Sequence, residues 1–178
     1  MSDDADRDQP VRDLSTWTID RLEAFATAQQ GPELERIRVV AQSHAYRSDE
    51  PPGVRLRWAK LSLNANERLP DDSSWSQARK TCQNFALRTW IIEHLGPDTD
   101  PDWKPDVVGA DTLAALTLDP GHAIALSRSW RDLPIEQIGE LRQHKNMTAH
   151  LDQLMGHLPP GPDRDQLASW TEVRRHLP

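Results

Sequence analysis

Apolar and small residues recur at steps of three and four, without a gap, over the span 75–92. The series comprises Trp75, Ala78, Cys82, Phe85, Thr89 and Ile92. Steps of this size place side chains on one face of an α-helix, and the serine pair just before the series is a favoured N-cap. Leu87, Trp90 and Ile91 widen the apolar sector. We therefore expect a long helix at the centre of the hydrophobic core.

The same periodicity, interrupted by turn and capping residues, extends through most of the chain. It predicts an all-α fold, a bundle of about six to eight helices in a single domain over residues 14–178. Residues 1–13 carry five Asp against two Arg and almost no apolar group, which predicts a disordered acidic tail. Proline and aspartate dominate a predicted long loop over 96–110, and Pro-Pro-Gly-Pro predicts a linker at 159–162 before the last helix.

The segment 54–63 fits two kinds of secondary structure. Val54, Leu56 and Trp58 alternate as in a β-strand, whereas Val54, Trp58 and Leu61 lie on one face of a helix. Periodicity alone does not choose between the two for so short an apolar run. We favour the helix, because no partner strand is evident elsewhere in the sequence.

Charge is distributed unevenly along the chain. The 178 residues include 28 acidic and 21 basic side chains, a net charge of -7. This acidic balance argues against non-specific binding to nucleic acid, because neutralising phosphates supplies most of that affinity. Residues 54–95 reverse the balance with seven Arg or Lys against four acids, so a local basic surface is possible there.

Several classes of protein are excluded by what the sequence lacks. The single cysteine, Cys82, rules out an internal disulfide and a Cys-rich zinc site, and its place on an apolar face predicts a poorly ionised, inert thiol. There is no phosphate loop, dinucleotide fingerprint, serine-hydrolase elbow or zinc helix motif, so we expect neither a cofactor nor a metal. No apolar run reaches 18 residues and the N-terminus has no apolar signal region, which predicts a cytoplasmic protein without a membrane span.

The stretch 134–159 is the longest uninterrupted helical pattern, and we predict a single helix there. Apolar stripes at its two ends flank the segment 142–150, which is almost wholly polar. This segment contains Arg142, Lys145, Asn146 and His150. Arg142, Asn146 and His150 are four residues apart and therefore share one face of the helix. A polar segment between two apolar stripes of one helix indicates that this part of the helix faces water or carries a function.

The chemistry of this polar set suits phosphate esters. A histidine can act as general acid or base near neutral pH, and a cation close by stabilises a developing phosphorane or an anionic leaving oxygen. These groups would serve metal-independent RNA cleavage, in which the 2′-hydroxyl attacks its own phosphate. One helix supplies few groups, so a homodimer that juxtaposes two copies across a two-fold axis would complete the site.

The run from Lys145 to His150, Lys-Asn-Met-Thr-Ala-His, resembles the signature helix of the HEPN superfamily (higher eukaryote and prokaryote nucleotide-binding domains). That signature is an Arg, commonly an Asn, three variable residues and a His. The resemblance implies a helical, usually dimeric protein, often a ribonuclease, of the kind found in abortive-infection and toxin–antitoxin defence systems. It implies that His150 is the catalytic histidine and Asn146 its polar companion.

This sequence departs from the HEPN pattern at one position. Lys145 stands where the family has Arg, which keeps the charge but loses the bidentate fork that grips phosphate. The departure is compatible with a degenerate member that binds RNA without cleaving it. Arg142 lies on the same face as His150 and could supply the missing cation.

Three other interpretations stay open at this point. Lys80, Asn84 and Arg88 share a helical face and form either a basic stripe facing a phosphate or acidic partner, or a solvated surface. Acidic loops and seven Trp would suit a non-enzymatic protein–protein interaction module, either immunity- or antitoxin-like or a subunit of a larger complex. Residues 134–158 would also suit a DNA-binding helix-turn-helix with its turn near 143–146. Whether the chain is an enzyme is therefore left open.

Overall fold

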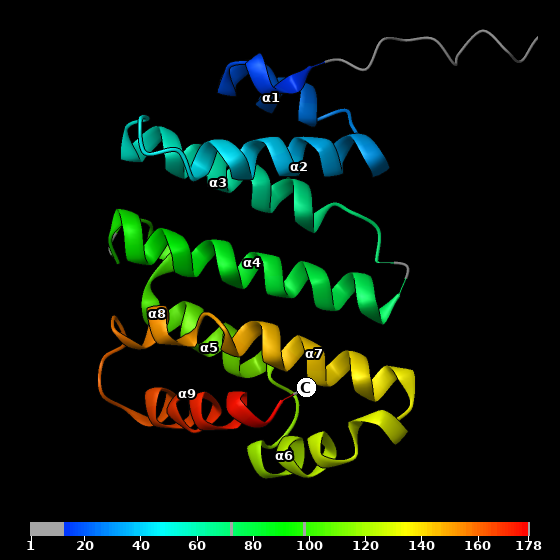
Figure 1. Ribbon diagram of the computed structural model, residues 1–178. Helices are drawn as coiled ribbons and strands as arrows, with labels where there is room; N and C mark the ends of the chain where they lie inside the picture. The colour runs from blue at the N-terminus through cyan, green and yellow to red at the C-terminus, as the bar shows by residue number, and fades with distance from the viewer. Residues whose placement is uncertain (1–12, 72, 98, 178) are drawn as a thin grey trace, which may run out of the picture.

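The computed structural model describes residues 13–71, 73–97 and 99–177, and within these it contains helices and no β-strand (Figure 1). The nine α-helices of this part of the chain are α1 (Ile19–Ala26), α2 (Gly31–Ala45), α3 (Pro52–Glu67), α4 (Ser74–Leu95), α5 (Pro105–Ala115), α6 (Pro120–Arg128), α7 (Ile135–Thr148), α8 (Leu151–Met155) and α9 (Pro162–Val173). Four short 3-10 helices accompany them: η1 (Leu14–Thr16), η2 (Pro101–Trp103), η3 (Trp130–Asp132) and η4 (Arg174–His176). The predicted all-α fold is confirmed, and the ambiguous segment 54–63 lies wholly inside α3.

The helix α4 separates two hydrophobic cores, and the other helices stack on either side of it (Figure 1). Leu87 and Ile91 pack into the core formed with α1, α2 and α3. Phe85 and Ile92 pack into the second core, formed with α5 to α9. The prediction that this helix is central is therefore confirmed, and both of its apolar flanks are used.

Two predicted boundaries differ from the structure. The acidic tail over 1–13 lies outside the described residues except for Asp13, whose Oδ1 accepts hydrogen bonds from Ser15 N at 3.0 Å and Ser15 Oγ at 2.6 Å and so caps η1. The predicted loop over 96–110 is wrong in its second half, because α5 begins at Pro105. Proline is tolerated in the first turn of a helix, where its missing N–H would have no intrahelical partner, so Pro105 opens the helix instead of preventing it.

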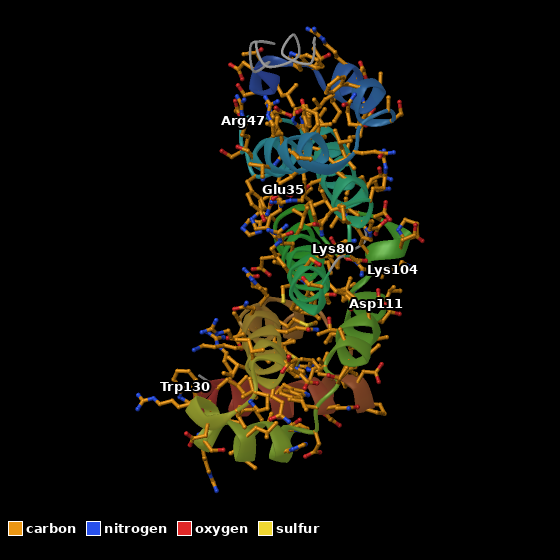
Figure 2. All side chains as sticks on the ribbon, turned by 90° about the vertical axis from the view of Figure 1, so that its right-hand side faces the viewer. Glu35, Arg47, Lys80, Lys104, Asp111 and Trp130 are labelled. Carbon is orange, nitrogen blue, oxygen red and sulfur yellow. The ribbon has the colours of Figure 1, made fainter. Side chains whose placement is uncertain are left out.

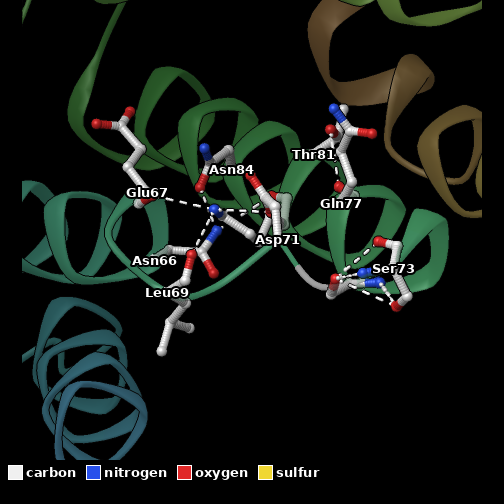
Figure 3. A network of polar contacts seen from close by, with 10 residues as sticks. Asn66, Glu67, Leu69, Asp71, Ser73, Gln77, Thr81 and Asn84 are labelled. Carbon is white, nitrogen blue, oxygen red and sulfur yellow. Dashed lines mark hydrogen bonds and ion pairs between the residues drawn. The ribbon is translucent and has the colours of Figure 1, made fainter. Parts of the chain in front are cut away.

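The side chain of Lys80 joins α4 to the end of α3. Figure 3 labels Glu67, Leu69 and Asp71, the residues that it contacts. Its Nζ donates hydrogen bonds to the carbonyl oxygens of Glu67 at 3.0 Å and Leu69 at 2.9 Å, and lies 2.9 Å from Asp71 Oδ1. The last carbonyls of a helix have no intrahelical partner, and a cation there also interacts favourably with the helix dipole. Lys80 therefore caps α3 and holds the following loop against α4.

The proposed basic stripe of Lys80, Asn84 and Arg88 is consequently used within the fold. The amide oxygen of Asn84 accepts a 2.6 Å hydrogen bond from Asn66 Nδ2. Arg88 pairs with Asp111 at 2.7 Å, which ties α4 to α5. These contacts make the stripe a set of helix-to-helix links, which neither of the two earlier interpretations anticipated.

Replacing Lys80 with methionine should lower the free energy of unfolding by about 2–3 kcal/mol, because carbonyl and carboxylate groups lose a charged donor in a mostly buried setting. The shift would be measured as a lower urea midpoint. Lys104→Met is the matched control: Lys104 is exposed at an outer edge of the molecule (Figure 2), and its loss should change stability by less than about 0.5 kcal/mol. Equal midpoints for the two variants would contradict the capping role of Lys80.

The predicted single helix over 134–159 is interrupted. The helix α7 ends at Thr148, residues Ala149 and His150 form a turn, and α8 follows from Leu151. Thr148 Oγ1 donates to the Lys145 carbonyl at 2.9 Å, and His150 N bonds to an oxygen only three residues back, at 3.1 Å. Such bonds tighten the last turn of a helix and end it, which apolar spacing alone does not reveal.

The prediction that residues 142–150 form a polar segment between two buried stripes is also wrong in part, because the buried stripe continues through this region. His144 and Thr148 are both 0% exposed and connect Leu141 to Leu151 within the second core. Arg142, Lys145 and Asn146 point the other way and are exposed. The polar residues of 142–150 therefore belong to two opposite faces, of which only one meets solvent.

Candidate functional site

A groove runs along α4, which forms its floor and the wall opposite α7, and Gln42 of α2 borders it. The three helices run in the same direction in the stack, with α4 between the other two (Figure 1). The groove has a volume of about 780 Å³. It is lined by Gln42 of α2, by Ser76, Ala78, Arg79, Cys82, Gln83 and Ala86 of α4, and by Gly139, Arg142, Gln143, Asn146, Ala149 and His150 of α7 and the turn after it.

Three of the four predicted site residues meet in this groove. Arg142, Asn146 and His150 line it, as their spacing of four along a helical face predicts. His150 keeps this position although it lies just beyond the end of α7. Lys145 is exposed but does not line the groove, since it follows Arg142 by three residues on the neighbouring flank of α7.

The second wall contributes polar groups that the sequence prediction missed. Arg79 and Gln83 of α4 face the residues of α7 across the groove. The prediction chose the stripe that begins at Lys80, one residue away and therefore turned by about 100° around the helix. A signal did exist, because Arg79, Gln83 and Ala86 follow the helical steps of four and three. Nothing in the sequence showed which face of α4 would lie opposite α7.

The described residues that line the groove include two arginines and a histidine but no carboxylate. This contrasts with the net charge of -7 for the chain. A cavity of about 460 Å³ on the other side of the α4–α7 contact shares Ala78, Gly139 and Gln143 with the groove, yet Glu136 and Glu140 line it. The two cavities therefore differ in the sign of their charge, and only the first suits an anionic ligand.

Most basic residues of the segment 54–95 are used to join helices. Arg57 pairs with Asp20 and Glu23, Lys60 with Asp100 and Arg88 with Asp111, while Arg68 and Lys80 donate to carbonyls at helix ends. Arg79, in contrast, forms no hydrogen bond or ion pair with the described residues. Arg55 likewise donates to the carbonyl oxygen of Ala45 at the end of α2, so the predicted local basic surface is reduced to Arg79, which lines the groove.

One carboxylate lies near the groove without lining it. Glu35 Oε2 accepts a 2.8 Å hydrogen bond from Arg38 Nε, and this bond is the main reason why the pKa of Glu35 lies below its usual value. The charges of Arg38 and Arg79 act in the same direction, while burial opposes them. Glu35 is therefore hydrogen-bonded to Arg38, while Arg79 interacts with it only through the attraction between their charges.

The imidazole of His150 is half-buried and has no hydrogen-bond partner among the described residues. It lies edge-to-face with Phe85, with ring centroids 6.3 Å apart. Four other histidines have ring nitrogens engaged in hydrogen bonds or ion pairs: His44, His94, His144 and His157. His150 thus presents unengaged ring nitrogens in a groove that also holds two cations.

The thiol of Cys82 also lines the groove, but it is not a nucleophile. Burial raises the pKa of Cys82 to about 11, so the thiol is protonated near neutral pH. Its Sγ donates to the carbonyl oxygen of Gln143 at 3.6 Å, which links α4 to α7. The prediction of an inert thiol is confirmed.

Two further observations concern the described residues. They contain no group of three or more His, Cys, Asp or Glu side chains placed to hold a metal ion. None of their helices is long and apolar enough to cross a membrane. Residues 143–146 are helical and lie inside α7, so the turn that the helix-turn-helix interpretation placed there is absent.

Comparisons with models of protein families, with curated proteins and with solved structures find no match to this chain. The function must therefore be argued from the groove itself.

Proposed function

We propose that the groove along α4 binds single-stranded RNA and that His150 promotes cleavage of the bound strand by internal transesterification. The observation that carries this proposal is the convergence of Arg79, Arg142 and an unengaged imidazole on one cavity lined by no carboxylate among the described residues. Guanidinium groups bind phosphate through several donors at once. A groove with cations on both walls suits a phosphodiester backbone.

The chemistry follows from the groups present. His150 accepts the proton of the ribose 2′-hydroxyl while the 2′-oxygen forms a bond to the adjacent phosphorus. The bond from phosphorus to the 5′-oxygen then breaks, the departing oxygen takes a proton from water, and the strand is left with a 2′,3′-cyclic phosphate. The hydroxide that remains takes the proton held by His150, which returns the imidazole to its neutral form. Arg79 and Arg142 stabilise the extra negative charge of the phosphorane, which is where preorganised cations contribute most.

The amides in the groove favour RNA over DNA. Gln143 and Asn146 line the groove on the side of α7. Their amide groups can accept a hydrogen bond from the ribose 2′-hydroxyl, which is the group by which proteins distinguish RNA from DNA.

The groove also bears on the predicted dimer. Within one chain, α4 already supplies Arg79 opposite Arg142 and His150, so a second copy is not needed to bring a second cation. A homodimer or a protein partner stays a prediction. The HEPN resemblance and a role in defence also stay proposals. That Lys145 stands where the family has Arg matters less if Arg142 and Arg79 hold the phosphate.

The proposal can be tested by fluorescence anisotropy with a labelled single-stranded RNA in EDTA. Arg79→Gln and Arg142→Gln should each weaken binding by about tenfold and reduce the slope of log affinity against log salt by about one. Arg131→Gln, at an exposed arginine of η3, removes the same charge outside the groove and should change neither quantity. The proposal fails if the wild-type protein does not bind RNA, or if the three variants weaken binding equally.

A further inference from the structure

The floor of the groove continues beyond the residues that line its cavity. Along α4, Arg79, Gln83, Ala86 and Trp90 follow one another at steps of four, three and four, so they share one face of the helix. Trp90 therefore lies one turn past Ala86 in the direction of the groove. At 1.5 Å per residue, Arg79 and Trp90 are about 16 Å apart along the helix, a length that spans a few nucleotides.

Aromatic side chains gather at this end of the groove. The ring of Tyr46 meets that of Trp90 edge-to-face, with centroids 4.7 Å apart and planes at 61°. The ring of His94 is stacked on Trp90 at 4.5 Å and 12°, and the guanidinium of Arg55 lies over Trp90 at 4.9 Å. Trp90 is thereby held by three neighbours, whereas Tyr46 is 41% exposed.

Tyr46 is connected to the lining of the groove by a hydrogen bond. Gln42 Nε2 donates to the phenolic oxygen of Tyr46 at 3.0 Å, and Gln42 Oε1 accepts from Arg38 Nη1 at 2.8 Å. Gln42 itself lines the groove. The position of the Tyr46 ring is thus fixed before any ligand arrives, and a large exposed aromatic ring held in one orientation is suited to stacking.

We infer that Tyr46, supported by Trp90, is a base-stacking subsite for the RNA strand whose phosphates lie at Arg79 and Arg142. The inference rests on the proposed function and adds a site for the bases, which the two arginines do not bind. Proteins that bind single strands combine a basic groove with aromatic rings on which bases stack, and both parts are present here. Arg55 adds a positive charge over the supporting ring of Trp90, and its Nε donates a 3.0 Å hydrogen bond to the carbonyl oxygen of Ala45.

The subsite has a consequence for specificity. A base in a duplex is already stacked and paired, so it must leave the duplex before it can stack on the ring of Tyr46. Single-stranded RNA therefore binds more tightly than a duplex of the same length. Because every base has a π-face, the stacking itself tolerates any sequence.

The test compares ligands with and without bases. In fluorescence anisotropy with a single-stranded RNA of about twelve nucleotides, Tyr46→Leu should bind about tenfold more weakly than the wild type. Tyr46→Phe keeps the ring and its contact with Trp90, loses the hydrogen bond from Gln42, and should retain most of the wild-type affinity. With an abasic strand of the same length, the wild type and Tyr46→Leu should bind equally, because there is no base to stack. Arg142→Gln should weaken binding of both strands.

The possible outcomes separate this inference from the proposed function. If the wild type binds RNA and Tyr46→Leu binds it equally well, the stacking subsite is overturned while the phosphate-binding groove stands. The subsite is also overturned if Tyr46→Leu loses as much affinity for the abasic strand as for the normal one, since the ring then acts on the shape of the groove. If the wild type binds neither strand, both proposals fail. Tyr46→Leu loses the hydrogen bond from Gln42 and the ring contact with Trp90, so its thermal unfolding is measured to show that the variant is still folded at the temperature of the binding assay.

Discussion

Replacing His150 with alanine is expected to reduce the rate of RNA cleavage in EDTA by about 100-fold or more, the usual contribution of a positioned general base. The imidazole is the group in the groove that can accept the 2′-hydroxyl proton near neutral pH, since the Cys82 thiol is protonated and no carboxylate is among the described lining residues. Initial rates on a labelled single-stranded RNA measure the effect. A substrate with a 2′-deoxy sugar at the cleaved position should not react.

The loss of activity in His150→Ala can be separated from unfolding. The main-chain N–H and carbonyl of His150 make the hydrogen bonds of the turn, whereas its side chain makes none with the described residues. Circular dichroism and the melting temperature should therefore change little. His122→Ala, at an exposed histidine of α6, is the matched control and should keep the full rate. An inert wild type, or an active His150→Ala protein, would leave the groove at most an RNA-binding site.

The parts of the fold that the sequence predicted correctly are those set by local periodicity. The steps of three and four between Trp75 and Ile92 placed α4 at the centre because a helix with apolar residues around most of its circumference must be covered on several sides. For 54–63 the spacing did not decide, and the lack of a partner strand favoured the helix, which the structure shows as part of α3. The errors at Pro105 and Thr148 fall at helix ends, where the choice depends on capping bonds and packing more than on spacing.

The sequence predicted the groove residues of α7 and the turn after it but missed those of α4, for a comparable reason. Arg142 and Asn146 lie on α7 and His150 lies in the turn directly after it, so their shared face still follows the helical spacing. Arg79 comes from a different helix, and the register between α4 and α7 is decided by which side chains interdigitate at the contact. Lys145 shows the converse error. The HEPN-like motif includes Lys145, but this residue lies on a neighbouring side of α7 and does not line the groove.

His144 illustrates a further limit of pattern-based prediction, because its sequence neighbours made it part of a polar segment. In the structure it is 0% exposed and lies beside Trp170, with ring centroids 5.0 Å apart. Its Nδ1–H donates to the carbonyl of Glu140 at 2.8 Å, and Nε2 accepts the N–H of Leu118 at 3.2 Å. Both ring nitrogens are satisfied in the neutral form, so the ring joins α7 to the loop before α6 from inside the core.

Substituting His144 with glutamine should therefore have two effects. At about pH 7.5 the variant should be less stable by about 2–3 kcal/mol, since a buried main-chain N–H and carbonyl lose well-placed partners and the ring leaves a space beside Trp170. The second effect is on the dependence of stability on pH. Burial lowers the pKa of His144, and the hydrogen bond to Glu140 and the charge of that residue only partly oppose this shift.

The sign of the pH effect follows from proton binding. In the unfolded chain, His144 takes up a proton as the pH falls through about 6.5, the ordinary value for histidine. In the folded protein it stays neutral to a lower pH, because protonating Nε2 would break the bond to Leu118 as well as bury a charge. The unfolded state then binds more protons, so stability falls as the pH decreases below about 6.5. Urea midpoints at about pH 7.5 and 5.5 should show a larger decrease for the wild type than for His144→Gln. Identical decreases would mean that the acid sensitivity comes from other groups and that the neutral, buried His144 does not contribute to it.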